Sequence, residues 1–269
     1  MGRQELKPID VLQATDRSNC GECGLATCMA FAVQVAQGKR AAGDCPRIAP
    51  AVAARIDDRR QAASDPAAEA AAALAPLKSR IRGLDFAAGA ERLGGALRDD
   101  RLVVRMLGRE FALDRDGELH AMCHINPWVH FPLLAYALEC RGTAPTGEWL
   151  AFGELPGALS WARFFDWRCE RELQKLAEAD FELLSDTLSL FAKAPAPAAV
   201  EADRAYRLLP LPRVPLLFTC WAPTADFPPQ VRLLFDGSAP DNLGVEALFR
   251  LSSGLVEMFK RIAIDHGGC

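Results

Sequence analysis

The sequence predicts an α+β protein, in which a small helical module at the N-terminus precedes a larger domain with a mixed or antiparallel sheet packed by helices. Four cysteines and short helical patterns are concentrated before residue 48. An alanine-rich stretch covers residues 49–82, and strand patterns and amphipathic helices fill residues 83–269. We therefore expect three parts: a module at 1–48, a partly helical connector at 49–82 and an α+β domain at 83–269.

The predicted module is organised around four cysteines with the spacing C-x2-C-x4-C-x16-C, namely Cys20, Cys23, Cys28 and Cys45. No apolar segment typical of a secretory signal follows Met1, so we expect a reducing compartment, where clustered thiols bind metal instead of pairing as disulfides. Structural zinc sites favour two cysteine pairs, whereas three cysteines in one loop and a distant fourth are typical of a cubane. The spacing favours a [4Fe-4S] cluster, with zinc or another cluster type as the alternatives.

The residues around the cysteines agree with a cluster. Gly21 and Gly24 allow tight turns that bring backbone N–H groups toward cluster sulfides. Residues 25–37 have helical periodicity, and the N-terminus of that helix would favour the negative charge of an iron–thiolate centre. A shorter helix is expected at residues 8–14, and Pro46 follows the last cysteine as in bacterial ferredoxins.

Residues 8–48 contain several specific runs: Asn19-Cys20-Gly21-Glu22-Cys23-Gly24, then Thr27-Cys28, Ala30-Phe31-Ala32, and a Gly-Lys before the closing Cys-Pro. On these runs the segment resembles the four-cysteine iron–sulfur domain of the corrinoid iron–sulfur protein large subunit and of the B subunit of the Rnf electron-transport complex. The resemblance implies that the four cysteines ligate a [4Fe-4S] cluster. It covers a module and not a whole protein.

Composition narrows the function classes. Half of the residues are hydrophobic, a quarter are charged and the net charge is −4, so a basic surface for nucleic acid is not expected. No apolar run is long enough to span a bilayer, so we expect no membrane insertion and a cytoplasmic location. An oxygen-sensitive cluster would suit an anaerobic way of life.

The larger domain is expected to begin with a helix, in which Asp85 lies near the start and Phe86, Ala90, Leu93 and Leu97 form one face. Strands at 102–106, 110–113 and 118–122 follow as an antiparallel meander. Helices are expected at 132–139, from Ser160 through Leu176, and at 181–191. Apolar strands at 214–221 and 231–235 precede a last amphipathic helix at 245–264.

Four runs in this domain also match a known family: Pro145-Thr146-Gly147-Glu148-Trp149, Phe152 to Gly157, Pro212 to Pro215, and Leu234 to Asp241. On these runs, residues 84–264 resemble an uncharacterised domain family that is often found behind the same iron–sulfur module in anaerobic bacteria and archaea. The resemblance implies an architecture and no mechanism.

Three of the four histidines lie within eleven residues, beside a cysteine, and form a candidate second site: His120, Cys123, His124 and His130. These side chains suit a haem, a corrinoid or a metal ion. The structural alternative is that the histidines form hydrogen bonds near a turn and that Cys123 belongs to the core. Cys140, Cys169 and Cys220 lie on apolar faces and are expected to pack in the core, whereas Cys269 is expected to be exposed.

Asp236 and Asp241 flank a turn after a strand, where a structural role is more common than a catalytic one. The sequence contains no G-x-S-x-G, G-x-x-x-x-G-K-[ST], H-E-x-x-H or G-x-G-x-x-G motif. Catalytic residues are therefore not identified.

We expect an electron-transfer protein or redox accessory, which exchanges single electrons with a redox partner protein or with a cofactor in its larger domain. The first alternative is a redox enzyme that uses a corrinoid, haem or second metal at the segment 120–130. The second is a cluster-bearing docking module without electron transfer.

Overall fold

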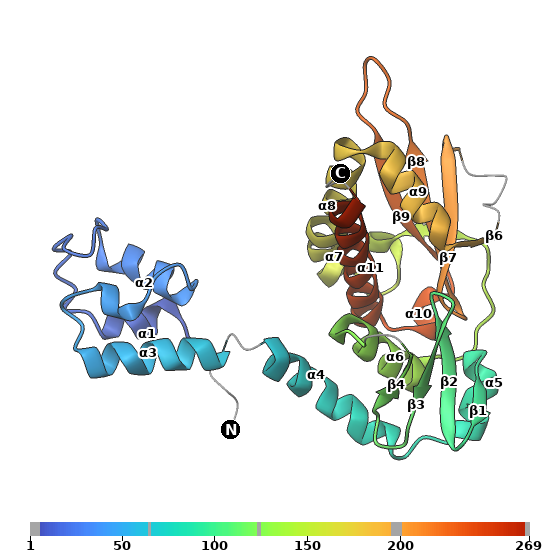
Figure 1. Ribbon diagram of the computed structural model, residues 1–269, viewed down its shortest axis with the longest axis horizontal. Helices are drawn as coiled ribbons and strands as arrows, with labels where there is room; N and C mark the ends of the chain where they lie inside the picture. Colours follow the sequence, from blue (N-terminus) through green and yellow to red (C-terminus); the bar gives the residue numbers. More distant parts are fainter. Residues whose placement is uncertain (1–5, 64–65, 123–124, 195–200, 267–269) are drawn as a thin grey trace. The chain divides into compact units, whose positions relative to one another are not determined.

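The computed structural model describes residues 6–63, 66–122, 125–194 and 201–266. The chain forms two compact units, residues 1–72 and 73–269 (Figure 1). Helices and two antiparallel sheets confirm the predicted α+β class. The boundaries expected at residues 48 and 82 stay a prediction about domain organisation.

The small unit is helical. Its elements are α1 (Pro8–Gln13), α2 (Cys28–Ala36), η1 (Ala42–Asp44) and α3 (Pro50–Ala63), and α4 (Pro66–Ile81) begins in it. A small core contains Val11, Phe31 and Val35, none more than 1% exposed. Ala53 and Ile56 of α3 pack in the same core, so helical residues of the alanine-rich stretch contribute to this unit.

Helix α2 begins three residues later than its periodicity predicts. Thr27 has extended backbone, and its side-chain oxygen accepts a hydrogen bond from Ala30 N at 3.1 Å. This N-cap satisfies one of the free N–H groups of the first turn. Residues 25 and 26 therefore belong to the loop of the cysteines.

The large unit contains two sheets in which all neighbouring strands are antiparallel. The first has the order β1 (Ala96–Arg98), β2 (Arg101–Met106), β3 (Arg109–Leu113) and β4 (Leu119–His120). The second has the order β5 (Trp149–Ala151), β9 (Gln230–Asp236), β8 (Val214–Trp221), β7 (Arg204–Leu211) and β6 (Ala192–Ala194). The meander and the two apolar strands are confirmed.

Helices complete the large unit. They are α5 (Phe86–Leu93), α6 (Pro127–Glu139), η2 (Phe152–Glu154), α7 (Leu159–Phe165), η3 (Asp166–Glu170), α8 (Arg171–Ala179), α9 (Phe181–Phe191), α10 (Ala239–Asn242) and α11 (Val245–His266). Phe218 of β8 contacts Phe259 of α11, with ring centroids 5.8 Å apart. Phe235 of β9 meets Phe152 and Phe165 edge-on, each with a centroid distance of 5.6 Å. Helices thus cover the apolar face of the five-stranded sheet.

The bounds of three helices in this unit differ from the prediction. Helix α6 begins at Pro127 instead of residue 132. The helix expected to include Leu97 ends at Leu93, because Gly94 adopts a left-handed conformation with φ of 65° and closes the helix end. Leu97 lies in β1 and is exposed. The expected helix from Ser160 runs from Leu159 as α7, a π-helical turn (η3) and α8 in succession.

Candidate metal centre

The four cysteines predicted to bind metal line one small cavity in the N-terminal unit. Cys20 and Cys23 lie in the loop between α1 and α2, Cys28 is the first residue of α2, and Cys45 follows η1. Cys20 is exposed and Cys23 is half-buried, whereas Cys28 and Cys45 are buried. The fold therefore brings thiols from three segments to one place, with Cys20 as the thiol most open to solvent.

The loop between α1 and α2 depends on backbone that favours glycine. Gly21 and Gly24 have φ of 75° and 79°, and Gly24 N donates to Gly21 O at 2.8 Å. A side chain at either position would be strained, because residues with a Cβ rarely adopt positive φ. Asn19, also left-handed, accepts a hydrogen bond from Cys28 N at 2.8 Å and so joins the loop to the start of α2.

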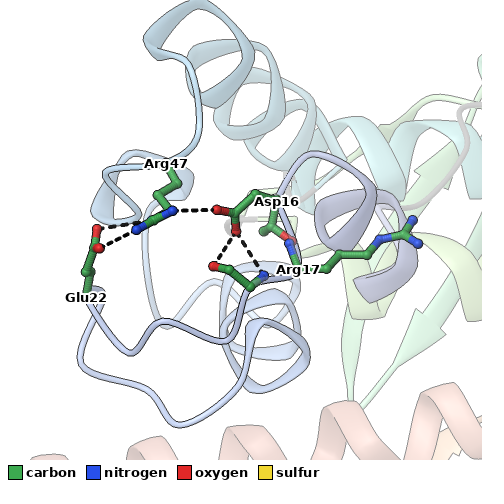
Figure 2. Close-up of polar contacts among 6 residues, drawn as sticks. Asp16, Arg17, Glu22 and Arg47 are labelled. Atoms are coloured by element: carbon green, nitrogen blue, oxygen red, sulfur yellow. Dashed lines mark hydrogen bonds and ion pairs between the residues drawn. The ribbon is translucent and has the colours of Figure 1, made fainter.

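Charged side chains connect the cysteine segments. Arg40 donates from Nη1 to the carbonyl of Cys23 at 2.6 Å. Arg47 lies between the carboxylates of Glu22 and Asp16, as Figure 2 shows, and forms ion pairs with both. Asp57 of α3 accepts from Ala42 N, so η1 and the following Cys45 are attached to α3.

Electrostatics keep these groups charged. Hydrogen bonds from Arg47 lower the pKa of Glu22, and those from Ser18, together with Arg47, lower the pKa of Asp16. Glu22 and then Asp16 raise the pKa of the Arg47 guanidinium, and the nearby charge of Cys20 adds to this shift. A permanent cation therefore lies beside the cysteine loop.

The donor set fits an iron–sulfur centre. Four thiols surround one cavity, and Cys28 lies at the N-terminus of α2, where the helix dipole favours negative charge. Within the described residues, no three His, Cys, Asp or Glu side chains are grouped closely enough to hold a single ion. The thiols thus stand around the cavity and do not meet at one point.

The histidines of the candidate second site have separate local partners. His120 of β4 is half-exposed, and its Nε2 lies 2.7 Å from Asp114 Oδ2. His130 of α6 is buried, and its Nε2 donates to the carbonyl of Gly117 at 2.9 Å. Cys123 and His124 lie outside the described residues, so the cofactor role of these four residues stays a prediction.

Asp236, considered in the sequence as a turn residue, is fully buried and accepts five hydrogen bonds. Four donors, the backbone and side chain of both Thr146 and Ser238, bind Oδ1, and Gly147 N binds Oδ2. This pattern confirms a structural role, because the carboxylate connects two of the runs on which the larger domain resembles a known family, residues 145–149 and 234–241.

The buried thiols follow the prediction. Cys140, Cys169 and Cys220 are each at most 1% exposed, and burial raises the pKa of Cys169 and Cys220 to about 12. Cys269 lies outside the described residues. No helix in the described part of the chain has the length and apolar character that a bilayer crossing requires.

Four charged residues that contact the cysteine segments were not predicted as parts of the site, namely Asp16, Glu22, Arg40 and Arg47. Only their positions in the sequence could have identified them, since acidic residues flank Cys20 and basic residues lie on either side of Cys45. Exposed charges are common on any surface, so their position alone does not distinguish them.

Comparison with known proteins gives two matching family models. Residues 16–47, which contain all four cysteines, match the family described as "Putative Fe-S cluster". A stretch of 52 residues is 36% identical to the corrinoid/iron-sulfur protein large subunit of Moorella thermoacetica, and covers 19% of this chain and 12% of that relative. The chain therefore corresponds to only a small part of that protein's length. No solved structure matches the chain.

The cysteine cavity and these matches support the class of iron–sulfur proteins. Residues 85–258, more than half of the chain, match the family named Domain of unknown function (DUF3786), and the chain belongs to that family. The resemblances expected from both parts of the sequence are thus confirmed.

Proposed function

We propose that Cys20, Cys23, Cys28 and Cys45 bind a [4Fe-4S] cluster and that the protein transfers electrons, or serves as a redox accessory, for a partner protein. The observation that carries the proposal is the common cavity lined by the four thiols. A cubane takes one cysteine thiolate at each iron, which suits four thiols spread around a cavity. The relative from Moorella thermoacetica, named as an iron–sulfur protein, adds support through the matched segment.

The proposed site is open to solvent on one side, as the exposure of its cysteines indicates. Cys28 and Cys45 are buried, so protein surrounds the site on their side. Cys20 is exposed, so this side is the expected approach for an electron donor or acceptor. A bound [4Fe-4S] cluster supplies a one-electron centre with a potential anywhere between about −700 and +450 mV, depending on hydrogen bonds, charge and exposure.

Anaerobic purification followed by iron and sulfide analysis, an optical spectrum and a reduced EPR spectrum tests the proposal. We expect about four irons per chain and a cubane signal after reduction with dithionite. Zinc without iron would contradict the cluster assignment. A cluster that no accessible potential reduces would leave a docking role in place of electron transfer.

The matched control separates the proposed ligands from other thiols. Cys28→Ser should lose the cluster, whereas Cys220→Ser, at a buried position in β8, should keep it. A second chromophore of haem or corrinoid type, lost in His120→Ala, would instead direct attention to the segment 120–130.

A further inference from the structure

We propose that Arg47 is a positioning residue that fastens the Cys45 segment to the loop of Cys20 and Cys23, and so retains the cluster. The inference rests on the proposed function, because it concerns the cluster that these cysteines would hold. It assigns a role to three charged residues, Asp16, Glu22 and Arg47, which we call the Arg47 clasp.

The clasp joins segments that are far apart in sequence. The Arg47 guanidinium donates to Glu22 from Nη2 at 2.6 Å and from Nε at 3.3 Å, and from Nη1 to Asp16 at 3.0 Å. Arg47 lies two residues after Cys45, Asp16 precedes Cys20, and Glu22 lies between Cys20 and Cys23. One side chain therefore connects the last ligand segment to both sides of the first ligand (Figure 2).

Both carboxylates are themselves held in place. Asp16 accepts from Ser18 N at 3.1 Å and from Ser18 Oγ at 2.7 Å. Glu22 lies within the Gly21–Gly24 turn. A two-bond contact between guanidinium and carboxylate fixes orientation as well as distance, which a lysine does not reproduce. The three hydrogen bonds of the clasp therefore hold the segment after Cys45 in one orientation relative to the loop of Cys20 and Cys23.

The solvent exposure of the clasp side chains favours a role in cluster retention over a role in folding stability. The three side chains are 37–46% exposed, so each ion pair contributes little to folding stability. Cluster retention is a more sensitive property, because one departing thiolate opens the site to water and to chelators. Arg40, which follows α2, also donates to the Cys23 carbonyl, whereas Arg47 extends from the segment after Cys45.

The position of the cation has a second effect that can be measured. The Arg47 guanidinium lies beside the loop of Cys20 and Cys23, where it pairs with Glu22. Reduction adds negative charge to a cluster, so a nearby cation favours the reduced state. Removing this cation should make the potential more negative, whereas Arg47→Lys should leave the potential close to that of the wild type.

The test measures iron loss from anaerobically loaded, full-length protein in bathophenanthroline disulfonate. We expect Arg47→Gln to lose iron about fivefold faster than the wild type, which corresponds to the loss of two ion pairs. Arg47→Lys and Glu22→Gln should each give a smaller increase, because a lysine cannot form the two-bond contact and a glutamine can accept only one of its two bonds. Redox titration of the same samples provides the second readout.

Two controls come from the same unit. Arg17→Gln removes another cation of the cysteine loop. The Arg17 side chain points away from Arg47 in Figure 2. Arg59→Gln breaks the exposed ion pair with Asp10, which joins α3 to α1. Both should lose iron at the wild-type rate.

The outcomes separate the two claims. Wild-type protein that binds no cluster would refute the proposed function and this inference together. A stable wild-type cluster with equal iron loss in Arg47→Gln and Arg59→Gln would overturn the clasp alone. If Arg47→Gln does not fold, as judged by circular dichroism, Glu22→Gln decides the question, and an unchanged rate in it also overturns the clasp.

Discussion

The small unit encloses a few apolar side chains around Val11, Phe31 and Val35, whereas the large unit buries seven of the eight residues of β8. The small unit instead devotes much of its chain to a loop held by side-chain hydrogen bonds, such as Asn19 with Cys28 and Arg40 with Cys23. Small domains bury too little apolar surface to be stable by packing alone and commonly depend on metal or disulfides. We therefore expect the small unit to be sensitive to loss of metal and the large unit to be sensitive to changes in its apolar core.

Removal of the metal should have the largest effect and should be confined to the small unit. Metal binding contributes on the order of 10 kcal/mol to small metal-dependent domains, so iron chelation should abolish amide protection around α1 and α2. Protection in β8 and β9 should not change, because their core is separate. Hydrogen exchange with mass spectrometry measures both regions together, and equal loss in both would break the comparison.

Matched truncations of buried phenylalanine come next. Phe31 and Phe152 are each 1% exposed, and Phe→Ala in a core costs about 3–5 kcal/mol. Phe31→Ala should unfold the cluster-free small unit, whereas Phe152→Ala should lower the free energy of unfolding of the large unit and leave it folded. Urea denaturation, followed by hydrogen exchange in each unit, distinguishes these results.

Asp236→Asn should have an intermediate effect on the large unit. An amide can still accept at one oxygen, but its NH2 group would face the N–H of Gly147, and one unsatisfied donor costs about 1–3 kcal/mol. Asp241→Asn, which breaks only the exposed pair with Arg141, is the control and should cost less than about 1 kcal/mol. Equal midpoints for the two variants in urea would contradict the structural role of Asp236.

Asp236 also predicts a response to acid. Burial by itself raises its pKa, but hydrogen bonds from Ser238, Thr146 and Gly147 lower it below the ordinary value of 3.8. The stabilisation is therefore present above 3.8 and is lost as the pH falls through the lower pKa of the folded state. Asp236→Asn should show a smaller loss of stability than the wild type in this range.

The smallest expected effect comes from His130. Burial lowers its pKa below the usual 6.5, although the hydrogen bond to the carbonyl of Gly117 acts in the opposite direction. The folded state therefore prefers the neutral ring, so stability present above 6.5 is lost as the pH falls from 6.5 through the folded pKa. His130→Gln should remove this slope in urea titrations between about pH 8 and 5, and His120→Gln should retain it.

The sequence predicted those features that depend on local pattern. Cysteine spacing indicated a common site, and the apolar run of β8 indicated a strand covered by other elements. Strand β7 was not predicted, because Arg204 and Arg207 interrupt its apolar character, and only pairing with β8 reveals it. The Arg47 clasp depends on contacts across 25 and 31 residues, for which exposed charges provide no periodic signal.

Burial of Cys140, Cys169 and Cys220 has a consequence for how an iron centre would be loaded. A high pKa leaves few thiolates at Cys169 and Cys220 near neutral pH, and thiolates are the form that captures iron and reacts with electrophiles. Among the described residues, incoming iron therefore encounters the exposed Cys20 and the half-buried Cys23 first, at the cavity of the small unit. Burial thus keeps metal and oxidants away from the thiols inside the large unit, whereas the cavity of the small unit can be reached from solvent at Cys20.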